Sequence, residues 1–434
     1  MDLARLKSRE GELGLANLVV GSKRLVTSLE HLYRLGSSIH GSLFDRQNLG
    51  APTDRIALGP PGRTEFNHAC ETQHDVINLA TYGYLGLGAD PRVKRAAGEA
   101  IERYGTHTGG PRLLSGTTPV HCELEMRLAE FLEAENVVTY SSGYGTNVSV
   151  IPALFGPGDL VVLDRNAHRS LYDGSVLAHA TVKRFAHNDL GHLERILQRT
   201  SGIARRLVAV DAVYSMEGHL APIPELVDLV HRHGAFLLAD EAHSIGVVGR
   251  TGRGVCEHFG IDPRAIDIRI GTLSKALPSV GGFAAVHAHV GAILRYSSHA
   301  RVFSAAMTPP DAAAALAGLE ILAREPERVA RLQQSASLFR SRLAGHGLDT
   351  FASETAVVPV RVADRLATLA IAHALLERGV YVNPILSPGV PVGSERLRCF
   401  ITATHSESDL LQAADTIADV VRGGQSQNAA AVAR

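Results

Sequence analysis

The sequence has little cysteine and no excess of charge of either sign, and both shortages exclude classes of protein. Its 434 residues include four cysteines, Cys70, Cys122, Cys256 and Cys399, which show no paired spacing. This pattern argues against a disulfide framework or a zinc site and favours the cytoplasm. The formal net charge is −1, without a sustained run of lysine or arginine. Nucleic acid and anionic membranes are therefore not expected as partners.

Long apolar runs are also missing. Residues 1–7 contain no signal-peptide hydrophobic region. The longest early apolar stretch, around residues 13–20, is too short to span a bilayer. The 21 histidines show no metal-ligand spacing. We therefore expect no transmembrane segment and no metal site.

The remaining composition is that of a globular protein, with 45% hydrophobic and 20% charged residues. A chain of this length is expected to form two or three units. Residues 1–70, with several Gly/Pro-rich turns, are predicted to be an N-terminal arm. Residues 71–325 are predicted to form a large domain and residues 326–422 a smaller α+β domain. The tail at 423–434 has a composition typical of disorder.

Short apolar runs indicate the strands of the large domain. Residues 160–163, 207–210 and 236–239 are continuous runs of apolar residues, and helical patterns separate them. Continuous runs are typical of strands that are buried on both faces. The sequence therefore predicts an α/β fold, with a mainly parallel sheet covered by helices.

Two charged residues follow such runs. Asp240 follows the run 236–239, and Lys275 lies in Gly-Thr-Leu-Ser-Lys, just after the run that ends at Ile270. A lysine can form a Schiff base with the aldehyde of pyridoxal 5'-phosphate (PLP), and an aspartate can keep its pyridine nitrogen protonated. Alone, Asp240 could be a helix N-cap and Lys275 a surface lysine. Together they favour a PLP site.

Other polar residues fall at the same expected edge of the sheet, where ligands bind in open parallel sheets. His243 suits a hydrogen bond to the phenolic oxygen of the cofactor, although a core histidine is the alternative. His168 follows the run 160–163 and can either stack on the pyridine ring or cap a helix. Ser215 has the weakest individual case, because serine is common in turns.

A glycine-rich segment is the expected phosphate site. Ser142, Gly143 and Tyr144 follow a β-rich run at 137–140 and precede an apolar helix. Glycines expose backbone N–H groups, and a helix N-terminus favours an anion. Thr272 can add a hydroxyl donor. The alternative reading of this segment is an ordinary turn.

Four motifs together resemble the α-oxoamine synthases, which are fold-type-I PLP enzymes. They lie at 271–275, at 240–244, at 214–218, and at 115–118 with His121 and Glu125. The resemblance covers about residues 76–420. Within the family, the segments 80–86 and 397–399 look most like bacterial serine palmitoyltransferase.

The resemblance implies a reaction and an assembly. The reaction is the decarboxylative condensation of a small amino acid (serine, alanine or glycine) with an acyl thioester of coenzyme A or an acyl-carrier protein. Its products are an α-amino ketone, carbon dioxide and free thiol. The implied assembly is a homodimer with shared active sites, in which Ser304 reaches the phosphate of the neighbouring subunit. The resemblance also assigns Tyr82 and Arg398 to the substrate, and Arg398 to its carboxylate.

Some positions depart from the family pattern and leave the substrates open. His219 stands where the family usually has aspartate, and Pro278 where it has glycine. A specialised-metabolite synthase supplied by an acyl-carrier protein is one alternative. Another fold-type-I aminotransferase would share Lys275 and Asp240. A non-catalytic partner subunit is less favoured, because Lys275 is present.

Overall fold

The computed structural model describes residues 46–48, 51, 53–61, 74–362 and 364–432. Most of the predicted N-terminal arm, including Cys70, lies outside these residues. The other three cysteines are free. None of the helices in the described ranges combines the length and the apolar character needed to cross a membrane.

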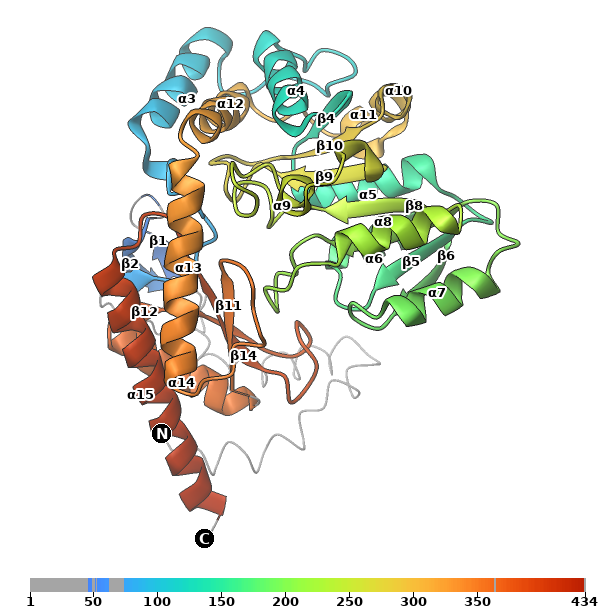
Figure 1. Ribbon diagram of the computed structural model, residues 1–434. Helices are drawn as coiled ribbons and strands as arrows, with labels where there is room; N and C mark the ends of the chain where they lie inside the picture. Colours follow the sequence, from blue (N-terminus) through green and yellow to red (C-terminus); the bar gives the residue numbers. More distant parts are fainter. Residues whose placement is uncertain (1–45, 49–50, 52, 62–73, 363, 433–434) are drawn as a thin grey trace, which may run out of the picture.

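A seven-stranded sheet lies in the upper right part of the molecule as seen in Figure 1. Its strand order is β4-β10-β9-β8-β7-β5-β6. The neighbouring strands from β9 to β6 pair in parallel, whereas β10 is antiparallel to both β9 and β4. The strands are β4 (Asn136–Tyr140), β5 (Leu160–Asp164), β6 (Thr181–Phe185), β7 (Arg206–Asp211), β8 (Phe236–Asp240), β9 (Ile268–Thr272) and β10 (Gly282–Val286). The carboxyl ends of the parallel strands therefore meet at one edge.

Helices bury both faces of this sheet. In β5, Val161 and Leu163 pack into a cluster with α5 (Gly143–Leu154), α6 (Arg169–Leu177) and α10 (Ala288–Ser297). Leu160 and Val162 pack into the other core, with α4 (Pro119–Leu132), α7 (Leu190–Arg199) and α8 (Ile223–Arg232). Successive side chains of a strand point to opposite faces, so burial on both faces requires an unbroken apolar run. The predicted fold class is confirmed.

Further helices extend this part of the chain. Helix α12 (Pro309–Arg324) packs against α3 (Pro91–Tyr104) and α4. The short helices α9 (Val255–Phe259) and α11 (His299–Val302) lie in connections around the sheet. Pro326 precedes α13 (Glu327–Gly345), close to the predicted start of the smaller domain.

Two smaller sheets complete the molecule. One has the order β11-β14-β13, from β11 (Val357–Arg361), β14 (Arg396–Phe400) and β13 (Asn383–Ile385). The other has the order β1-β2-β3-β12, from β1 (Arg46–Asn48), β2 (Arg55–Pro61), β3 (His74–Asn78) and β12 (Val380–Tyr381). Strand β12 pairs in parallel with β3. The second sheet thus joins chain segments from both sides of the predicted large domain.

The C-terminal helices run beside these sheets. Helix α15 (Glu407–Val432) packs against α13 and α14 (Arg365–Glu377), and Figure 1 shows α13 and α15 side by side. Helix α15 continues through residues 423–432, where the composition predicted disorder. The limits of the large and small domains stay a prediction.

Candidate active site

A cavity of about 450 Å³ opens at the carboxyl edge of the large sheet. It brings together nearly all of the predicted site residues. From the large sheet and the helices and loops that follow its strands these are Ser142, Gly143, Tyr144, His168, Ser215, Asp240, His243, Thr272 and Lys275, with Tyr82 and Arg398 from outside this part of the chain. Ser304 is not among the lining residues. Asn147, Asp211 and Phe400 also line the cavity, and the sequence did not single them out.

Lys275 lies three residues beyond the end of β9. Burial lowers the pKa of its amine, although the carboxylates of Asp240 and Asp211 oppose this effect. Its Nζ atom lies 5.8 Å from the ring centroid of Tyr82. A lowered pKa increases the neutral fraction of an amine, and the neutral form is the nucleophile.

Asp240 is the last residue of β8, and its carboxylate is held on both oxygens. The backbone N–H of Ala242 donates to Oδ1 at 3.0 Å. The amide of Asn147, in the first turns of α5, donates to Oδ2 at 2.6 Å and also lies 2.9 Å from the hydroxyl of Ser170. The carboxylate therefore has a fixed orientation, and Asn147 helps to set it.

Asp211 ends β7 and pairs in register with Asp240. Burial and the neighbouring charge of Asp240 raise the pKa of Asp211 well above its ordinary value. Its Oδ1 accepts the backbone N–H of His168 at 2.9 Å. The sequence did carry a signal for this residue, because Asp211 is a charged residue that directly follows a predicted strand.

Two histidines face the cavity from different sides. His168 caps α6, and its Nδ1 accepts the N–H of Ser170 at 3.3 Å. The Nδ1 of His243 lies 2.6 Å from the hydroxyl of Tyr84, and its ring stacks on Phe400. Burial, together with the positive charge of Lys275, lowers the pKa of His243 well below its ordinary value. The imidazole of His243 is thus neutral at neutral pH.

Arg398 enters the cavity from β14. Its guanidinium lies 4.7 Å from the ring centroid of Phe400, and one N–H donates to the carbonyl of Ser215 at 3.3 Å. Its Nε is buried and has no hydrogen-bond partner. Burial lowers the pKa of Arg398, but a guanidinium keeps its charge at physiological pH. This side chain retains donors for an anionic group.

The N-terminus of α5 forms the other end of the cavity. Ser142 caps this helix, and its Oγ accepts the N–H of Gly145 at 2.9 Å. A Cβ atom at position 143 would lie 2.9 Å from Oγ1 of Thr272. Glycine is therefore needed for the helix to approach the end of β9. The hydroxyl of Thr272 donates to the carbonyl of Gly281 at 3.0 Å.

The side chains of two predicted cofactor-binding residues have other hydrogen-bond partners within one chain. The ring of Tyr144 is half exposed, and its hydroxyl donates to Asp173 at 2.7 Å. Ser304 lies beyond α11, outside the cavity, where its hydroxyl is 3.4 Å from the carbonyl of Ala305. Within one chain, the α5 N-terminus and the end of β9 form this end of the cavity.

These groups fit PLP by their chemistry. A buried amine, a fixed carboxylate and a glycine at a helix N-terminus face one cavity. They match the aldehyde, the pyridine nitrogen and the phosphate respectively. Within the described residues, no cluster of histidine, cysteine, aspartate and glutamate is arranged to hold a metal ion.

The family model for aminotransferase class I and II matches residues 74–417. The chain belongs to this family. The chain is 42% identical to the 8-amino-7-oxononanoate synthase of Symbiobacterium thermophilum, over 80% of its own length and 89% of that protein. It is 35% identical to the serine palmitoyltransferase of Sphingobacterium spiritivorum, over 80% and 87% of the two chains.

Solved structures agree with these relatives. The chain resembles a high-resolution structure of SPT with PLP. The TM-score is 0.84 and the identity 30%, and the match covers 98% of this chain and 100% of the other. The serine palmitoyltransferase of Sphingomonas wittichii also gives a TM-score of 0.84, with 31% identity and coverage of 93% and 98%.

The comparisons confirm the predicted family and cofactor. This protein is a PLP-dependent enzyme whose relatives are α-oxoamine synthases. The predicted reaction type, the decarboxylative condensation of an amino acid with an acyl thioester, is that of these relatives. The sequence motifs pointed most strongly to serine palmitoyltransferase, whereas the 8-amino-7-oxononanoate synthase of Symbiobacterium thermophilum has the higher identity of the two relatives.

Proposed function

We propose that this enzyme condenses a small amino acid (serine, alanine or glycine) with an acyl thioester. The observation that carries the proposal is the position of Arg398, which lines the same cavity as Lys275 and has a buried Nε without a partner. A charged fork near the reactive amine is suited to the carboxylate of an amino acid. The products are an α-amino ketone, carbon dioxide and free thiol.

Four of the cavity residues predicted from the sequence have the following proposed roles toward the substrate or cofactor. Bound PLP supplies an electron sink for the carbanion of the amino acid. Lys275 holds the cofactor and moves the proton at the amino-acid Cα. Asp240 faces the pyridine nitrogen and keeps it protonated. His243 is a hydrogen-bond partner for the phenolic oxygen, and His168 holds the plane of the ring.

The proposed phosphate contacts come from two subunits. The backbone N–H groups at Ser142, Gly143 and Tyr144 belong to the N-terminus of α5, which favours an anion. Thr272 lies beside them at the end of β9. Ser304, from a second copy of the chain, supplies a further hydroxyl. Tyr82 contacts the substrate, because its ring lies beside Lys275.

A homodimer is part of the proposal. Leu114 and Phe303 are 78% and 80% exposed, and a second copy of the chain would cover such apolar side chains. Their two segments touch, because the N–H of Ala306 donates to the carbonyl of Gly110. A location in the cytoplasm also stays a prediction, supported by the pattern of cysteines.

The source of the acyl group is a choice between coenzyme A and an acyl-carrier protein. The names of the relatives point to different products, so they leave the acyl group open. An acyl-CoA and a carrier-protein thioester, the latter as in a specialised-metabolite synthase, are the two outcomes of the test.

One experiment tests reaction type and substrates together. Serine, alanine or glycine labelled at the carboxyl carbon is incubated with the PLP-loaded enzyme and a series of acyl-CoA and acyl-carrier thioesters. We expect labelled carbon dioxide only with thioester present, in step with free thiol. An aminotransferase would instead require a keto acid and would keep the label in its product. Turnover that needs a keto acid and releases no thiol would refute the proposal, and an inert protein would favour a non-catalytic subunit.

A further inference from the structure

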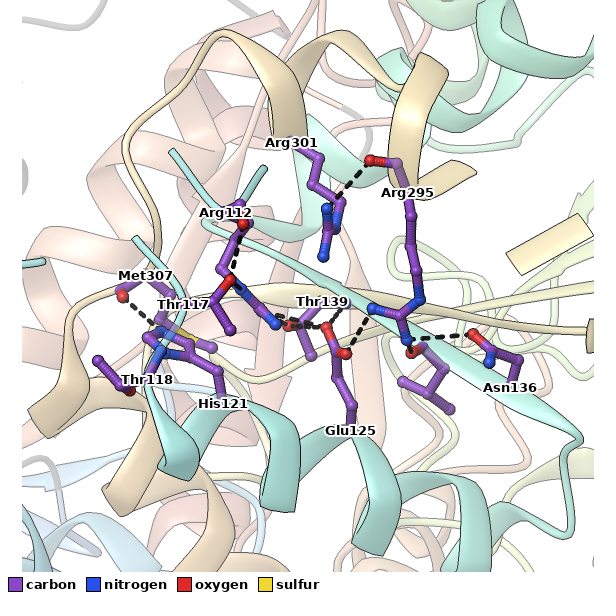
Figure 2. Close-up of polar contacts among 11 residues, drawn as sticks. Arg112, Thr117, Thr118, His121, Glu125, Asn136, Thr139, Arg295, Arg301 and Met307 are labelled. Carbon is purple, nitrogen blue, oxygen red and sulfur yellow. Dashed lines mark hydrogen bonds and ion pairs between the residues drawn. The ribbon is translucent and has the colours of Figure 1, made fainter. Parts of the chain in front are cut away.

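The motif at 115–118, with His121 and Glu125, lies outside the cavity, so the proposed chemistry does not account for it. His121 and Glu125 are one turn apart on α4, and both are buried. Figure 2 shows that they join side chains from the preceding loop, from β4 and from the segments around α10 and α11. This buried network connects α4 to the part of the chain that carries Ser304.

His121 links the start of α4 to the carbonyl of Met307. The backbone N–H of Thr118 donates to Nδ1 of His121 at 3.2 Å, so Nδ1 is an acceptor. In a neutral ring the proton is then on Nε2, which donates to the carbonyl of Met307 at 2.7 Å. Burial and the nearby charge of Arg112 lower the pKa of His121 to about 4. The ring is therefore neutral and has one tautomer.

Met307 is the last residue of the 303–307 segment, which follows α11. The N–H of Phe303 donates to the carbonyl of His299 at 2.8 Å, and the N–H of Ala306 donates to that of Gly110 at 3.0 Å. Phe303 is 80% exposed, whereas Met307 is 5% exposed. The segment is thus anchored at both ends, with Ser304 between the anchors.

Glu125 binds side chains that lie close to both anchored ends of the segment. Its Oε1 lies 3.1 Å from an N–H group of Arg112, two residues after Gly110, and accepts the hydroxyl of Thr139 at 2.8 Å. Its Oε2 accepts an N–H of Arg295, in α10, at 2.8 Å. The carbonyl of Arg295 in turn accepts an N–H of Arg301, in α11, at 3.0 Å. One carboxylate therefore connects the loop before α4 with the helices that lead into the segment.

The charges explain why a carboxylate is needed here. Arg112, Arg295 and Arg301 surround Glu125 in the network of Figure 2. The Nε of Arg301 is buried without a partner. Without the carboxylate, three guanidinium groups would repel one another in a buried place.

We infer that His121 and Glu125 are positioning residues that hold the 303–307 segment in the shape with which Ser304 reaches the cofactor phosphate of a second subunit. The inference rests on the proposed dimer. It has a direct consequence. A change at His121 in one subunit weakens cofactor binding in the other subunit, and cofactor binding in the subunit that carries the change stays intact.

Two substitutions at His121 separate positioning from helix capping. In His121→Asn, the side-chain oxygen can still accept the N–H of Thr118, but the side chain is too short to reach Met307. In His121→Gln, the amide can donate to Met307, but the acceptor for Thr118 is lost. We expect PLP to bind about tenfold more weakly to His121→Asn. This is the effect of losing the one proposed hydrogen bond from Ser304 to the charged phosphate. His121→Gln should bind PLP like the wild type.

Mixed dimers test the direction of the effect, with the PLP dissociation constant from absorption titration as the readout. Each dimer carries Lys275→Ala in one subunit, so only one site can bind PLP covalently. When His121→Asn is in the subunit that keeps Lys275, we expect wild-type affinity. When His121→Asn is in the same subunit as Lys275→Ala, we expect the affinity to fall about tenfold.

The other outcomes overturn the inference. Equally weakened PLP binding in both dimers would mean a general effect on the fold. Weakened PLP binding only in the dimer with His121→Asn in the subunit that keeps Lys275 would mean that His121 serves the site of its own subunit. No change in either dimer would mean that His121 does not position the segment. Ser304→Ala in the same two arrangements tests the proposed dimer contact itself. If Ser304→Ala shows the effect on the second subunit and His121→Asn does not, only this inference fails; if neither does, both fail.

A second variant keeps the test valid if His121→Asn does not fold. Ala306→Pro removes the N–H that donates to Gly110 and replaces none of the side chains of the buried network. It should weaken PLP binding in the second subunit only. Wild-type affinity in both mixed dimers of Ala306→Pro would contradict the inference.

Discussion

Replacement of Arg398 by alanine should weaken amino-acid binding and leave cofactor binding unchanged. In the structure its guanidinium makes one hydrogen bond to the carbonyl of Ser215 and a 3.4 Å contact with the sulfur of Met216. Its remaining donors are available to a carboxylate in the cavity. We expect Arg398→Ala to fold like the wild type, because it loses only this hydrogen bond, the sulfur contact and the contact with the ring of Phe400.

The size of the effect follows from the bonds that are lost. A hydrogen bond to a charged group contributes about 1.5–3 kcal/mol. Loss of the carboxylate contact should therefore raise the dissociation constant of the amino acid about 10- to 150-fold. Arg398→Lys keeps the charge but not the planar fork, so its affinity should lie between those of wild type and alanine variant.

The assay is the change in the absorption of the PLP-loaded enzyme as serine, alanine or glycine is added. Arg361→Ala is the matched control. Arg361 lies on β11, which pairs with the strand of Arg398, but it is exposed and forms an ion pair with Asp349 at 2.5 Å. A dissociation constant for Arg398→Ala within about twofold of wild type would refute the reasoning. An equal loss in Arg361→Ala would refute it too.

Three further substitutions test other parts of the structure. Lys275→Ala should abolish the borohydride-reducible PLP adduct while the protein stays folded; a retained adduct would contradict its role. Gly143→Ala should weaken PLP binding about tenfold, because its Cβ would lie 2.9 Å from Oγ1 of Thr272, whereas Gly98→Ala, with open space around it, should bind PLP normally. Glu125→Gln should lower the free energy of unfolding at neutral pH by about 3 kcal/mol, measured by urea denaturation. Burial alone would raise the pKa of Glu125, but the adjacent arginines lower it. Its stabilising effect is therefore complete above the unfolded pKa of about 4.3 and is lost as the pH falls through the lower folded value. The difference between this variant and the wild type should accordingly shrink in acid, and a constant difference would contradict the assignment.

Much of the sheet and the cavity could be predicted from sequence, because the relevant signals are local. The strands that carry Asp240 and Lys275 are continuous apolar runs, and parallel pairing brings their carboxyl ends to one edge. Asp211 carried the same local signal as Asp240 but was not singled out. A charged residue at the end of each predicted parallel strand should be treated as a candidate.

Other features had no local signal. Asn147 lies inside a helix, and only the folded structure shows its amide 2.6 Å from Asp240. The contact of His121 with Met307 spans 186 residues. Helical periodicity places His121 and Glu125 on one face of α4, but it does not show which backbone groups meet that face. Such contacts depend on tertiary packing, which a single sequence does not encode in its periodicity.

The pairing of β3 with β12 affects the order in which the chain can be completed during synthesis. Strand β3 ends at Asn78, and its partner Tyr381 in β12 is made much later. At ribosomal speeds of about 5–20 residues per second, β3 waits on the order of 15–60 s for this partner. During that interval one edge of β3 has no β12 to pair with, and such an edge can pair with another chain. The late synthesis of β12 thus leaves β3 open to misassembly on the ribosome.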